Sequence, residues 1–291
     1  MVNGAKAKMY AERINRVCDY IYQNLNEEFS LQQLSQLANF SKYHFHRQFA
    51  EYTGVSLFRF IQLMRLKRAS YRLAFEKHQR IIDIALEAQF ENPESFSRAF
   101  KSTFGQTPSQ FRQKPQWPGW HSKYQFSIPT IERKQTMEIK IVDFKETRVA
   151  VLEHRDAPNR VYESASKFIE WRKQSKLSPV KTSGTYGIAY DDPKTTDAEN
   201  FRFDICGSIK SEIPDNPQGI KAGVIPGGRC AVIRHHGSHD NIDSSVHYLY
   251  GEWLPQSGEE LRDFPCFFHY LNLVYEVPEH ELLTDIYLPL K

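Results

Sequence analysis

Two arginines, Arg47 and Arg98, occur in matching surroundings 51 residues apart, which indicates an internal repeat. A guanidinium group can donate a fork of two hydrogen bonds to guanine O6 and N7, the commonest specific contact with a base. For each arginine, a phosphate contact or a salt bridge within the domain is the alternative. The repeated residues are Phe45, Arg47, Phe49 and Gly54 in one copy and Phe96, Arg98, Phe100 and Gly105 in the other.

Each arginine lies on the second helix of a predicted helix-turn-helix. In the stretch 80–112, apolar residues repeat with helical spacing on both sides of a break at 91–93. The second helix ends at Gly105 and would bury an aromatic face, while its polar face stays free to enter a DNA groove. An ordinary pair of surface helices is the alternative. The two units are placed at about 30–54 and 80–105.

Between the units, Ser56 can cap a helix that continues to about Phe75. About twenty residues at 1.5 Å each make this helix a spacer of roughly 30 Å, and one turn of duplex is about 34 Å. A single chain would therefore place 41–52 and 92–103 in two successive major-groove segments on one face of DNA.

Charge is distributed unevenly along the 291 residues, a length that suggests two domains. Residues 1–120 hold 17 Lys and Arg against 10 Asp and Glu, and the remainder holds 21 against 25. A basic N-terminal domain suits phosphate contact, although such an excess also occurs on solvated helices. No run of about 18 apolar residues and no signal peptide are present, so we expect a cytoplasmic protein without a membrane partner.

The sequence contains little that indicates catalysis or metal binding. Its four cysteines are scattered, which argues against a zinc cluster or a disulfide framework. The run 234–239 holds three histidines, but neighbours on an extended strand point to opposite faces and no carboxylate or cysteine completes a site. No nucleophile elbow, phosphate loop or metalloprotease motif is present. We therefore expect no catalytic residue, no metal and no other cofactor.

Residues 8–114 resemble the AraC/XylS family of transcription regulators through specific motifs. These are SKYHFHRQF at 41–49, Arg65 and Ala69, Ile84 with Ala85, FSRAF at 96–100 and FGQTPSQFR at 104–112. The resemblance implies an all-α DNA-binding domain at 1–114, with two helix-turn-helix units that bind double-stranded DNA at an asymmetric site as a monomer. RNA polymerase is the expected protein partner.

Position in the family pattern and outward helical phase together assign the DNA contacts. For base edges we expect Tyr43, His46 and Arg47 in the first unit and Asn92, Ser95, Ser97 and Arg98 in the second. Lys42, Lys101, Arg112 and Lys114 are the candidates for phosphate contact. Glu94, acidic at the DNA-facing end, would accept a hydrogen bond from cytosine N4 or discriminate against other bases.

The turns of the two units depart from the family, which usually has glycine there. This chain has Asn39 in the first turn and Gln89 in the second. Asparagine tolerates left-handed geometry, whereas glutamine does so less easily, so the second turn is expected to be strained or differently shaped. Ahead of the first turn, Ser30 and Gln33 have the spacing of a capping box.

A linker is predicted from 115 to 136, where three prolines occur without a clear hydrophobic period. Its aromatic residues are too numerous for a purely flexible tether, so part of it is expected to pack on one domain. These residues are Trp117, Trp120, Tyr124 and Phe126.

The remainder, 137–291, is predicted to be an α+β domain of two duplicated strand-helix-strand-strand modules. An offset of 81 places Arg148, Ala150, Val151 and His154 on Arg229, Ala231, Val232 and His235. The two modules would pair sheets under two helices, with a ligand cleft between them. Strand-like runs lie at 137–142, 147–154, 186–190, 201–209, 229–235, 267–276 and 282–289, and helical spacing at 161–171 and 242–253.

Residues 137–291 resemble the gyrase-inhibitor-like effector-binding domain. The motifs are GIAYDDP at 187–193, WLP at 253–255, PCF at 265–267, YLN at 270–272 and TDIYLP at 284–289. In many relatives a buried glutamate, two residues before the tyrosine, pairs with cationic ligands or acts in hydrolysis, and here that position is Phe268. We therefore expect an apolar or aromatic ligand, or none. The cleft would be lined by Tyr190, Trp253, Phe268 and Tyr270, for each of which a plain core role is the alternative.

The chain as a whole is predicted to be a one-component transcription regulator, a DNA reader followed by a sensor or interaction domain, and not an enzyme. One alternative is a small-molecule hydrolase built on the second domain, which Phe268 disfavours because a phenylalanine cannot take a proton. The other is a ligand-independent activator whose C-terminal domain binds protein.

Overall fold

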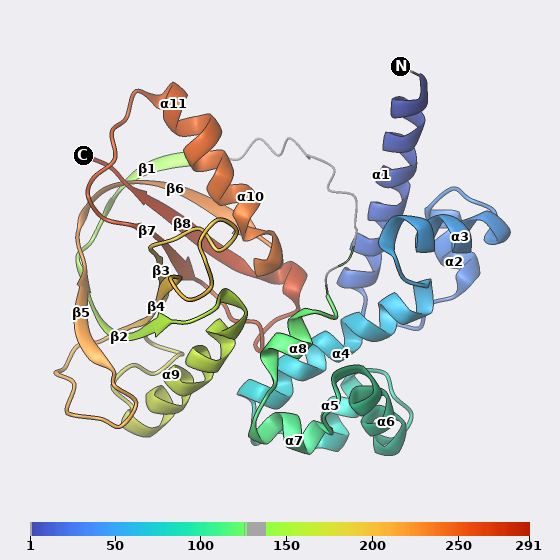
Figure 1. The fold of residues 1–291 in the computed structure, drawn as a ribbon, viewed down its shortest axis with the longest axis horizontal. Helices are drawn as coiled ribbons and strands as arrows, with labels where there is room; N and C mark the ends of the chain where they lie inside the picture. Colours follow the sequence, from blue (N-terminus) through green and yellow to red (C-terminus); the bar gives the residue numbers. More distant parts are fainter. Residues whose placement is uncertain (1, 125, 127–137) are drawn as a thin grey trace. The chain divides into compact units, whose positions relative to one another are not determined.

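The computed structural model describes residues 2–124, 126 and 138–291, and the chain divides into two compact units, residues 1–135 and 136–291 (Figure 1). The first unit is helical, and the second is a sheet with helices, which confirms the predicted fold class. Residues 125 and 127–136 of the expected linker, and the first residue of the first expected strand, Met137, lie outside the described residues. Among the described residues, none of the helices is both long and apolar enough to span a lipid bilayer.

Two helix-turn-helix pairs, α2–α3 and α5–α6, form the first unit together with the helices that support them. The long helix α4 contacts α3, α5 and α7, so it joins the two pairs. The helices are α1 (Val2–Gln23), α2 (Leu31–Leu37), α3 (Lys42–Thr53), α4 (Leu57–Phe75), α5 (Ile81–Glu87), α6 (Pro93–Phe104), α7 (Pro108–Gln113) and α8 (Trp117–His121).

Side-chain caps begin most of these helices. Ser41 and Ser56 accept hydrogen bonds from the backbone of the third residue after them, and Ser30 does the same from the Gln33 N–H. The predicted capping box at Ser30 is incomplete, because the Gln33 amide donates instead to the Tyr20 hydroxyl at 2.8 Å. A complete capping box occurs at Thr107, where α7 begins.

The turns of the two pairs have the same geometry. Asn39 (φ 52°) and Gln89 (φ 60°) both adopt the left-handed conformation. In each turn the next residue donates a 3.0 Å backbone hydrogen bond, from Phe40 to the Ser35 carbonyl or from Phe90 to the Ala85 carbonyl. The expectation of a differently shaped second turn is therefore wrong. The strain of a glutamine in left-handed geometry remains.

Aromatic residues from the predicted linker pack on the first unit, as expected. The Trp117 ring lies 5.2 Å from that of Phe111, and the Phe126 ring lies 5.2 Å from that of Phe60. Trp117 and Trp120 are fully buried and belong to the short helix α8. The first part of the linker is thus an integral part of the helical unit.

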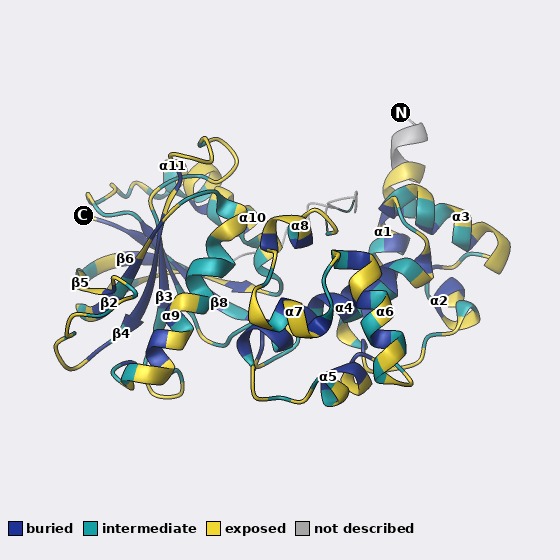
Figure 2. Ribbon diagram, turned by 60° about the horizontal axis from the view of Figure 1, so that its bottom comes forward, coloured by how far each residue is buried: buried dark blue, intermediate teal, exposed yellow. Residues whose placement is uncertain are grey.

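The second unit is built on one eight-stranded antiparallel sheet in the order β1-β6-β8-β7-β3-β4-β2-β5. Apolar residues of α9 and of the segment from α10 to η3 pack on one face of the sheet, and the central strands are mostly buried (Figure 2). The strands are β1 (Ile139–Phe144), β2 (Thr147–Arg155), β3 (Thr185–Ala189), β4 (Arg202–Ser208), β5 (Lys221–Ile225), β6 (Gly228–His236), β7 (Cys266–Tyr270) and β8 (Leu283–Pro289). The helices are α9 (Val161–Ser175), α10 (Ile242–His247), the π-helical turn η3 (Tyr248–Trp253) and α11 (Leu254–Ser257).

The duplication is confirmed, because the offset of 81 carries β2, β3 and β4 onto β6, β7 and β8 with identical bounds. The strand β5 was not predicted, because its Ala-Gly centre lacks a strand pattern, and β7 ends at Tyr270, earlier than the predicted end at residue 276. The modules also do not form separate sheets. The first strand of each copy pairs with the second strand of the other copy, β1 with β6 and β5 with β2.

Alternating residues give the sheet two apolar faces. Phe168 and Trp171 of α9 pack on one face, where Leu152, Phe203 and Ile205 point. On the opposite face the Phe267 and Tyr287 rings stack at 4.9 Å, next to Phe144. The side chains at the centre of the sheet are therefore enclosed from both sides.

Replacing Gln89 with glycine is expected to stabilise the first unit. A non-glycine residue in left-handed geometry costs about 1–2 kcal/mol, and the greater freedom of glycine in the unfolded chain returns part of that cost. We expect Gln89→Gly to raise the free energy of unfolding by up to about 1 kcal/mol in urea denaturation. Asn39→Gly is the matched control and should gain less, because asparagine tolerates this geometry; the reverse ranking would contradict strain at Gln89.

Candidate functional site

The outward face of α3 brings three of the expected base-contact residues together. Tyr43 is 89% exposed and Arg47 is exposed, while His46 is partly covered and its ring centroid lies 6.1 Å from that of Phe58. Positions three and four apart share one helical face, so these side chains lie side by side. The opposite face buries its phenylalanines completely and thereby fixes the orientation of the helix.

On α6 the expected residues divide into two groups. Arg98 is exposed and Ser97 partly exposed on the outward face. Asn92 and Ser95 begin the helix, where Asn92 Oδ1 accepts from the Ser95 N–H at 2.8 Å and Ser95 Oγ donates to the Asn92 carbonyl at 2.9 Å. The polar groups of these two side chains are therefore partly used in capping. Glu94 is exposed beside them.

Arg47 and Arg98 have no hydrogen-bond or ion-pair partner within residues 2–124, 126 and 138–291. Other arginines of the first unit are engaged: Arg65 donates to backbone carbonyls and Arg80 pairs with Asp83 at 2.8 Å. The alternative of an intradomain salt bridge thus has no support in the described part of the chain. Both guanidinium groups are available to an external acceptor.

The expected phosphate contacts differ in accessibility. Lys101 and Lys114 are exposed, and Lys42 is exposed while its Nζ donates to Gln32 Oε1 at 3.1 Å. Arg112 is partly covered, and its Nε and Nη2 atoms are buried without a hydrogen-bond partner among the described residues. Partial burial of the Arg112 guanidinium removes water from the charged group and lowers its pKa. Arg112 is therefore the least accessible of the four.

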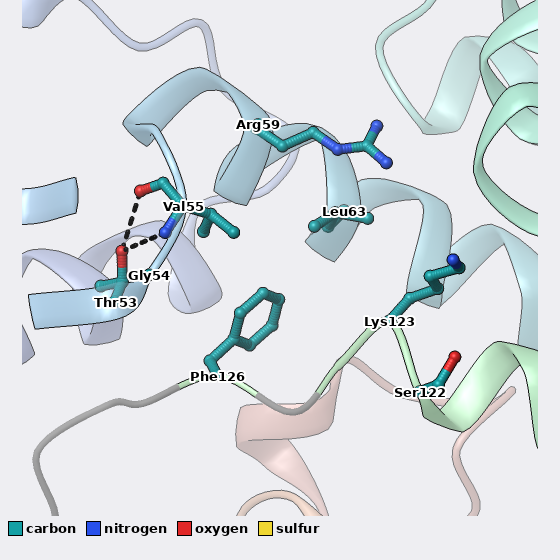
Figure 3. A pocket seen from close by; sticks show the side chains of 8 residues that line it. All are labelled: Thr53, Gly54, Val55, Arg59, Leu63, Ser122, Lys123 and Phe126. Atoms are coloured by element: carbon teal, nitrogen blue, oxygen red, sulfur yellow. Dashed lines mark hydrogen bonds between the residues drawn. The ribbon is translucent and has the colours of Figure 1, made fainter. Parts of the chain in front are cut away.

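A hollow of about 310 Å³ lies where α3 passes into α4, and the ring of Phe126 points into it (Figure 3). Arg59 and Lys123 give its lining positive charge. The lining residues are Thr53, Gly54, Val55, Arg59, Leu63, Ser122, Lys123 and Phe126. Sequence reasoning missed this feature because its two sides are far apart in the chain.

In the second unit, Phe268 and Tyr270 point to the helix-covered face of the sheet. Their ring centroids lie 6.3 Å apart, and the Phe203 ring stacks at 6.3 Å from Phe268. A Cβ atom at Gly187, which faces Phe268 across the strands, would collide with Phe203 and the Tyr270 hydroxyl. Trp253 packs against the same cluster. A hollow of about 280 Å³ lies beside Tyr270, lined by 180–185, 269–273 and Glu276.

Tyr190 does not join this cluster. Its hydroxyl donates to Asp204 Oδ2 at 2.9 Å, and Asp204 alternates with residues of the helix-covered face, so it points to the other side of the sheet. The guanidinium groups of Arg155 and Arg202 lie 5.6 and 5.5 Å from the ring centre. Burial, and then Asp204, raise the pKa of Tyr190 to about 12.

His154 and His235 occupy equivalent buried positions in the two modules. His235 Nδ1 lies 2.9 Å from Ser245 Oγ, and its Nε2 lies 3.1 Å from the Ser238 carbonyl. A carbonyl can only accept, so neutral His235 carries its proton on Nε2, and Nδ1 accepts from the serine. His154 repeats these contacts with Ser164 and the Ala157 carbonyl. Within the part of the chain that the structure describes, no three His, Cys, Asp or Glu residues are arranged to hold a metal ion.

Comparison with known proteins gives matches to both units. A model described as a helix-turn-helix domain matches residues 34–114, and one described as a GyrI-like small molecule binding domain matches residues 137–291. The Probable transcriptional regulator YgiV of Escherichia coli K12 is 50% identical over 155 residues, which cover 53% of this chain and 97% of that protein. The uncharacterized HTH-type transcriptional regulator YbfP of Bacillus subtilis is 38% identical over 103 residues, 35% of each chain. The crystal structure of the EcmrR C-terminal domain is 17% identical, with a TM-score of 0.44, over 53% of this chain and 98% of that one.

Two histidines, the buried His235 and the half-buried His269, are expected to make the second unit less stable in acid. Burial lowers the pKa of His235 and of His269 below the ordinary value of 6.5, so the unfolded chain binds protons that the folded chain does not. Their contribution is therefore fully present above about pH 6.5 and is lost as the pH falls through and below that value.

The test is urea denaturation at pH 7.5 and pH 5.5. His269 stacks on Tyr186 at 4.5 Å, so His269→Phe keeps an aromatic ring there but cannot titrate. We expect a smaller loss of unfolding free energy between the two pH values in His269→Phe than in the unmodified protein. His247→Gln, at an exposed position, should leave the loss unchanged. Equal losses in all three proteins would contradict a role for His269.

Proposed function

The chain belongs to the family with a GyrI-like small molecule binding domain, here preceded by an AraC-type helix-turn-helix domain, and we propose that a single copy reads two successive major-groove segments of one DNA site. The protein is a DNA-binding transcription regulator with a small-molecule-binding domain.

One observation carries the proposal: Arg47 and Arg98 occupy equivalent exposed positions on α3 and α6 and lack partners among the described residues. Each is held outward by a buried phenylalanine on either side of it in the helix. The 19 residues of α4 correspond to about 28 Å of helix, close to the roughly 34 Å of one duplex turn. This spacing suits two arms of one chain on one face of DNA.

In this proposal each of the two arginines donates two hydrogen bonds to a guanine, at O6 and N7. Tyr43, His46 and Ser97 contact neighbouring base edges. Asn92 and Ser95 cap α6, so they contact DNA through the polar atoms that the cap does not use. One such group is Asn92 Nδ2. Lys42, Lys101 and Lys114 contact phosphates, with a smaller contribution from the partly covered Arg112. RNA polymerase is the proposed protein partner.

For the second unit we propose an apolar or aromatic ligand that packs on Phe268, Tyr270 and Trp253. Phe268 supplies no charge to neutralise a cation and no group to take a proton. Tyr270 is a poor base near neutral pH, because burial raises the pKa of its phenol. We propose that the domain binds its ligand without hydrolysing it, and turnover of an aryl ester that is lost in Tyr270→Phe would favour the hydrolase alternative.

Loss of either arginine is expected to reduce sequence selectivity. A bidentate contact to a base discriminates by about 1–3 kcal/mol, so Arg98→Ala should weaken binding to the cognate site by roughly 5- to 150-fold while binding to scrambled DNA changes much less. The measurement is fluorescence anisotropy at fixed salt, on a site obtained by selecting bound genomic fragments. Arg47→Ala should act in the same direction.

Arg80→Ala is the control, since Arg80 is an exposed arginine already paired with Asp83. It should bind the cognate site like the unmodified protein. Lys101→Ala should weaken binding to all sequences alike and reduce its salt dependence. If Arg98→Ala binds the cognate site as tightly as the unmodified protein does, Arg98 does not contact a base.

The ligand class is tested by thermal shift with two aromatic probes of similar shape, neutral 1-methylnaphthalene and cationic 1-naphthylmethylammonium. We expect the neutral probe to stabilise the protein more, because the cation must leave water without a carboxylate partner at Phe268. In Phe268→Glu the cationic probe should stabilise the protein more than the neutral one. Phe268→Gln, whose side chain is as large as that of glutamate but uncharged, should show no preference for the cation. Stronger stabilisation of the unmodified protein by the cation would contradict the proposal.

A further inference from the structure

The two DNA-reading arms share an arginine but otherwise present different chemistry. We define the first arm as α2, α3 and the start of α4, and the second arm as α5, α6 and the start of α7. Ser56 and Thr107, the N-caps of α4 and α7, correspond at the same offset of 51 residues as Arg47 and Arg98. At this offset Tyr43, His46 and Phe58 of the first arm correspond to Glu94, Ser97 and Ser109 of the second.

Phe58 is the unexpected member of this set. It lies in the first turn of α4, yet 55% of it is exposed. Its ring is tilted by 48° against that of His46, at 6.1 Å. His46 lies on the same helical face as Tyr43 and Arg47, so Phe58 extends that face with a second exposed carbon-rich ring.

An apolar surface beside Arg47 suits one feature of the major groove. Thymine alone among the four DNA bases presents a methyl group there, at C5, and apolar side chains contact it. The second arm instead presents the carboxylate of Glu94 and two hydroxyl groups, which hydrogen-bond to base edges and gain nothing from a methyl group. Since Arg47 has no partner in the described residues and Lys42 begins the same helix, this face suits DNA better than an apolar protein.

We infer that Tyr43, His46 and Phe58 form a thymine-methyl contact surface, so that the first arm reads thymines next to its guanine and the second arm reads hydrogen-bonding groups. This inference rests on the proposed function. It makes the DNA site chemically asymmetric, and it adds Phe58, a residue outside the recognition helix, to those that determine specificity.

The test replaces thymine with deoxyuridine, which removes the C5 methyl group and leaves base pairing intact. Each thymine of a selected site is replaced singly, and the Kd of the full-length protein is measured at fixed salt. We expect a weakening of about fourfold for each contacted methyl in the half bound by the first arm, from the burial of one methyl group. Replacement in the other half should change the Kd by less than about twofold, a difference of only a few tenths of a kcal/mol.

Variants assign the effect to the surface. Phe58→Ser gives the first arm the type of residue found in the second, and it should bind thymine and deoxyuridine sites with more nearly equal affinity. Phe58→Leu keeps an apolar side chain and should retain most of the methyl effect. Ser109→Ala is the matched control at the equivalent exposed position of the second arm, and it should retain the full effect. Thermal unfolding of each variant shows that it is folded before binding is compared.

Two results would overturn the inference and leave the proposed function standing. One is selective binding that tolerates deoxyuridine at every position of the first half. The other is a Phe58→Ser variant that loses affinity equally for thymine and deoxyuridine sites. A complete lack of sequence-selective binding by the unmodified protein would instead remove both the inference and the function on which it rests.

Discussion

Burial of two phenylalanines four residues apart is the constraint on which the first unit depends. Phe45 with Phe49, and Phe96 with Phe100, fill the cores under α3 and α6 and are fully buried. A short helix has little stability of its own, so this burial both forms the helix and fixes its rotation about its axis. Arg47 and Arg98, each two residues from both of its helix's buried rings, must then point outward. Recognition geometry is thus a consequence of core packing.

In the second unit, exchanged strand pairing joins two copies of one module. Each copy contributes three adjacent strands, and its remaining strand pairs with the other copy, β1 with β6 and β5 with β2. Neither module therefore has a complete sheet alone. The repeated contacts of His154 and His235 with a serine and a carbonyl fasten equivalent helices to equivalent strands. The centre, where β3 pairs with β7, belongs to both copies, which is where a ligand site lined by both modules can arise.

Duplication followed by divergence describes both units. In the first, the turns at Asn39 and Gln89 keep one geometry while the outward faces differ. In the second unit, the offset of 81 makes Arg172 of one module equivalent to Trp253 of the other, and Arg172 is buried. The guanidinium of Arg172 donates to Thr185 Oγ1 at 2.7 Å and to the Ser183 carbonyl, and burial lowers its pKa to about 10. Shared positions maintain each fold, and the positions that differ give each copy its own chemistry.

The sequence alone determined most of the elements, the two duplications and the fold class, because periodic apolar spacing and caps such as Ser41 and Thr107 are local signals. It did not reveal β5 or α8, which lack a clear hydrophobic period. It also placed Arg47 and Arg98 outward, which follows from helical phase. Only the tertiary structure showed that Phe58 reaches His46 and that Tyr190 lies on the opposite face of the sheet from Phe268. It alone revealed the exchange of β1 and β5. These features join segments distant in sequence, and their side chains are oriented by strand pairing and packing, which local periodicity does not encode.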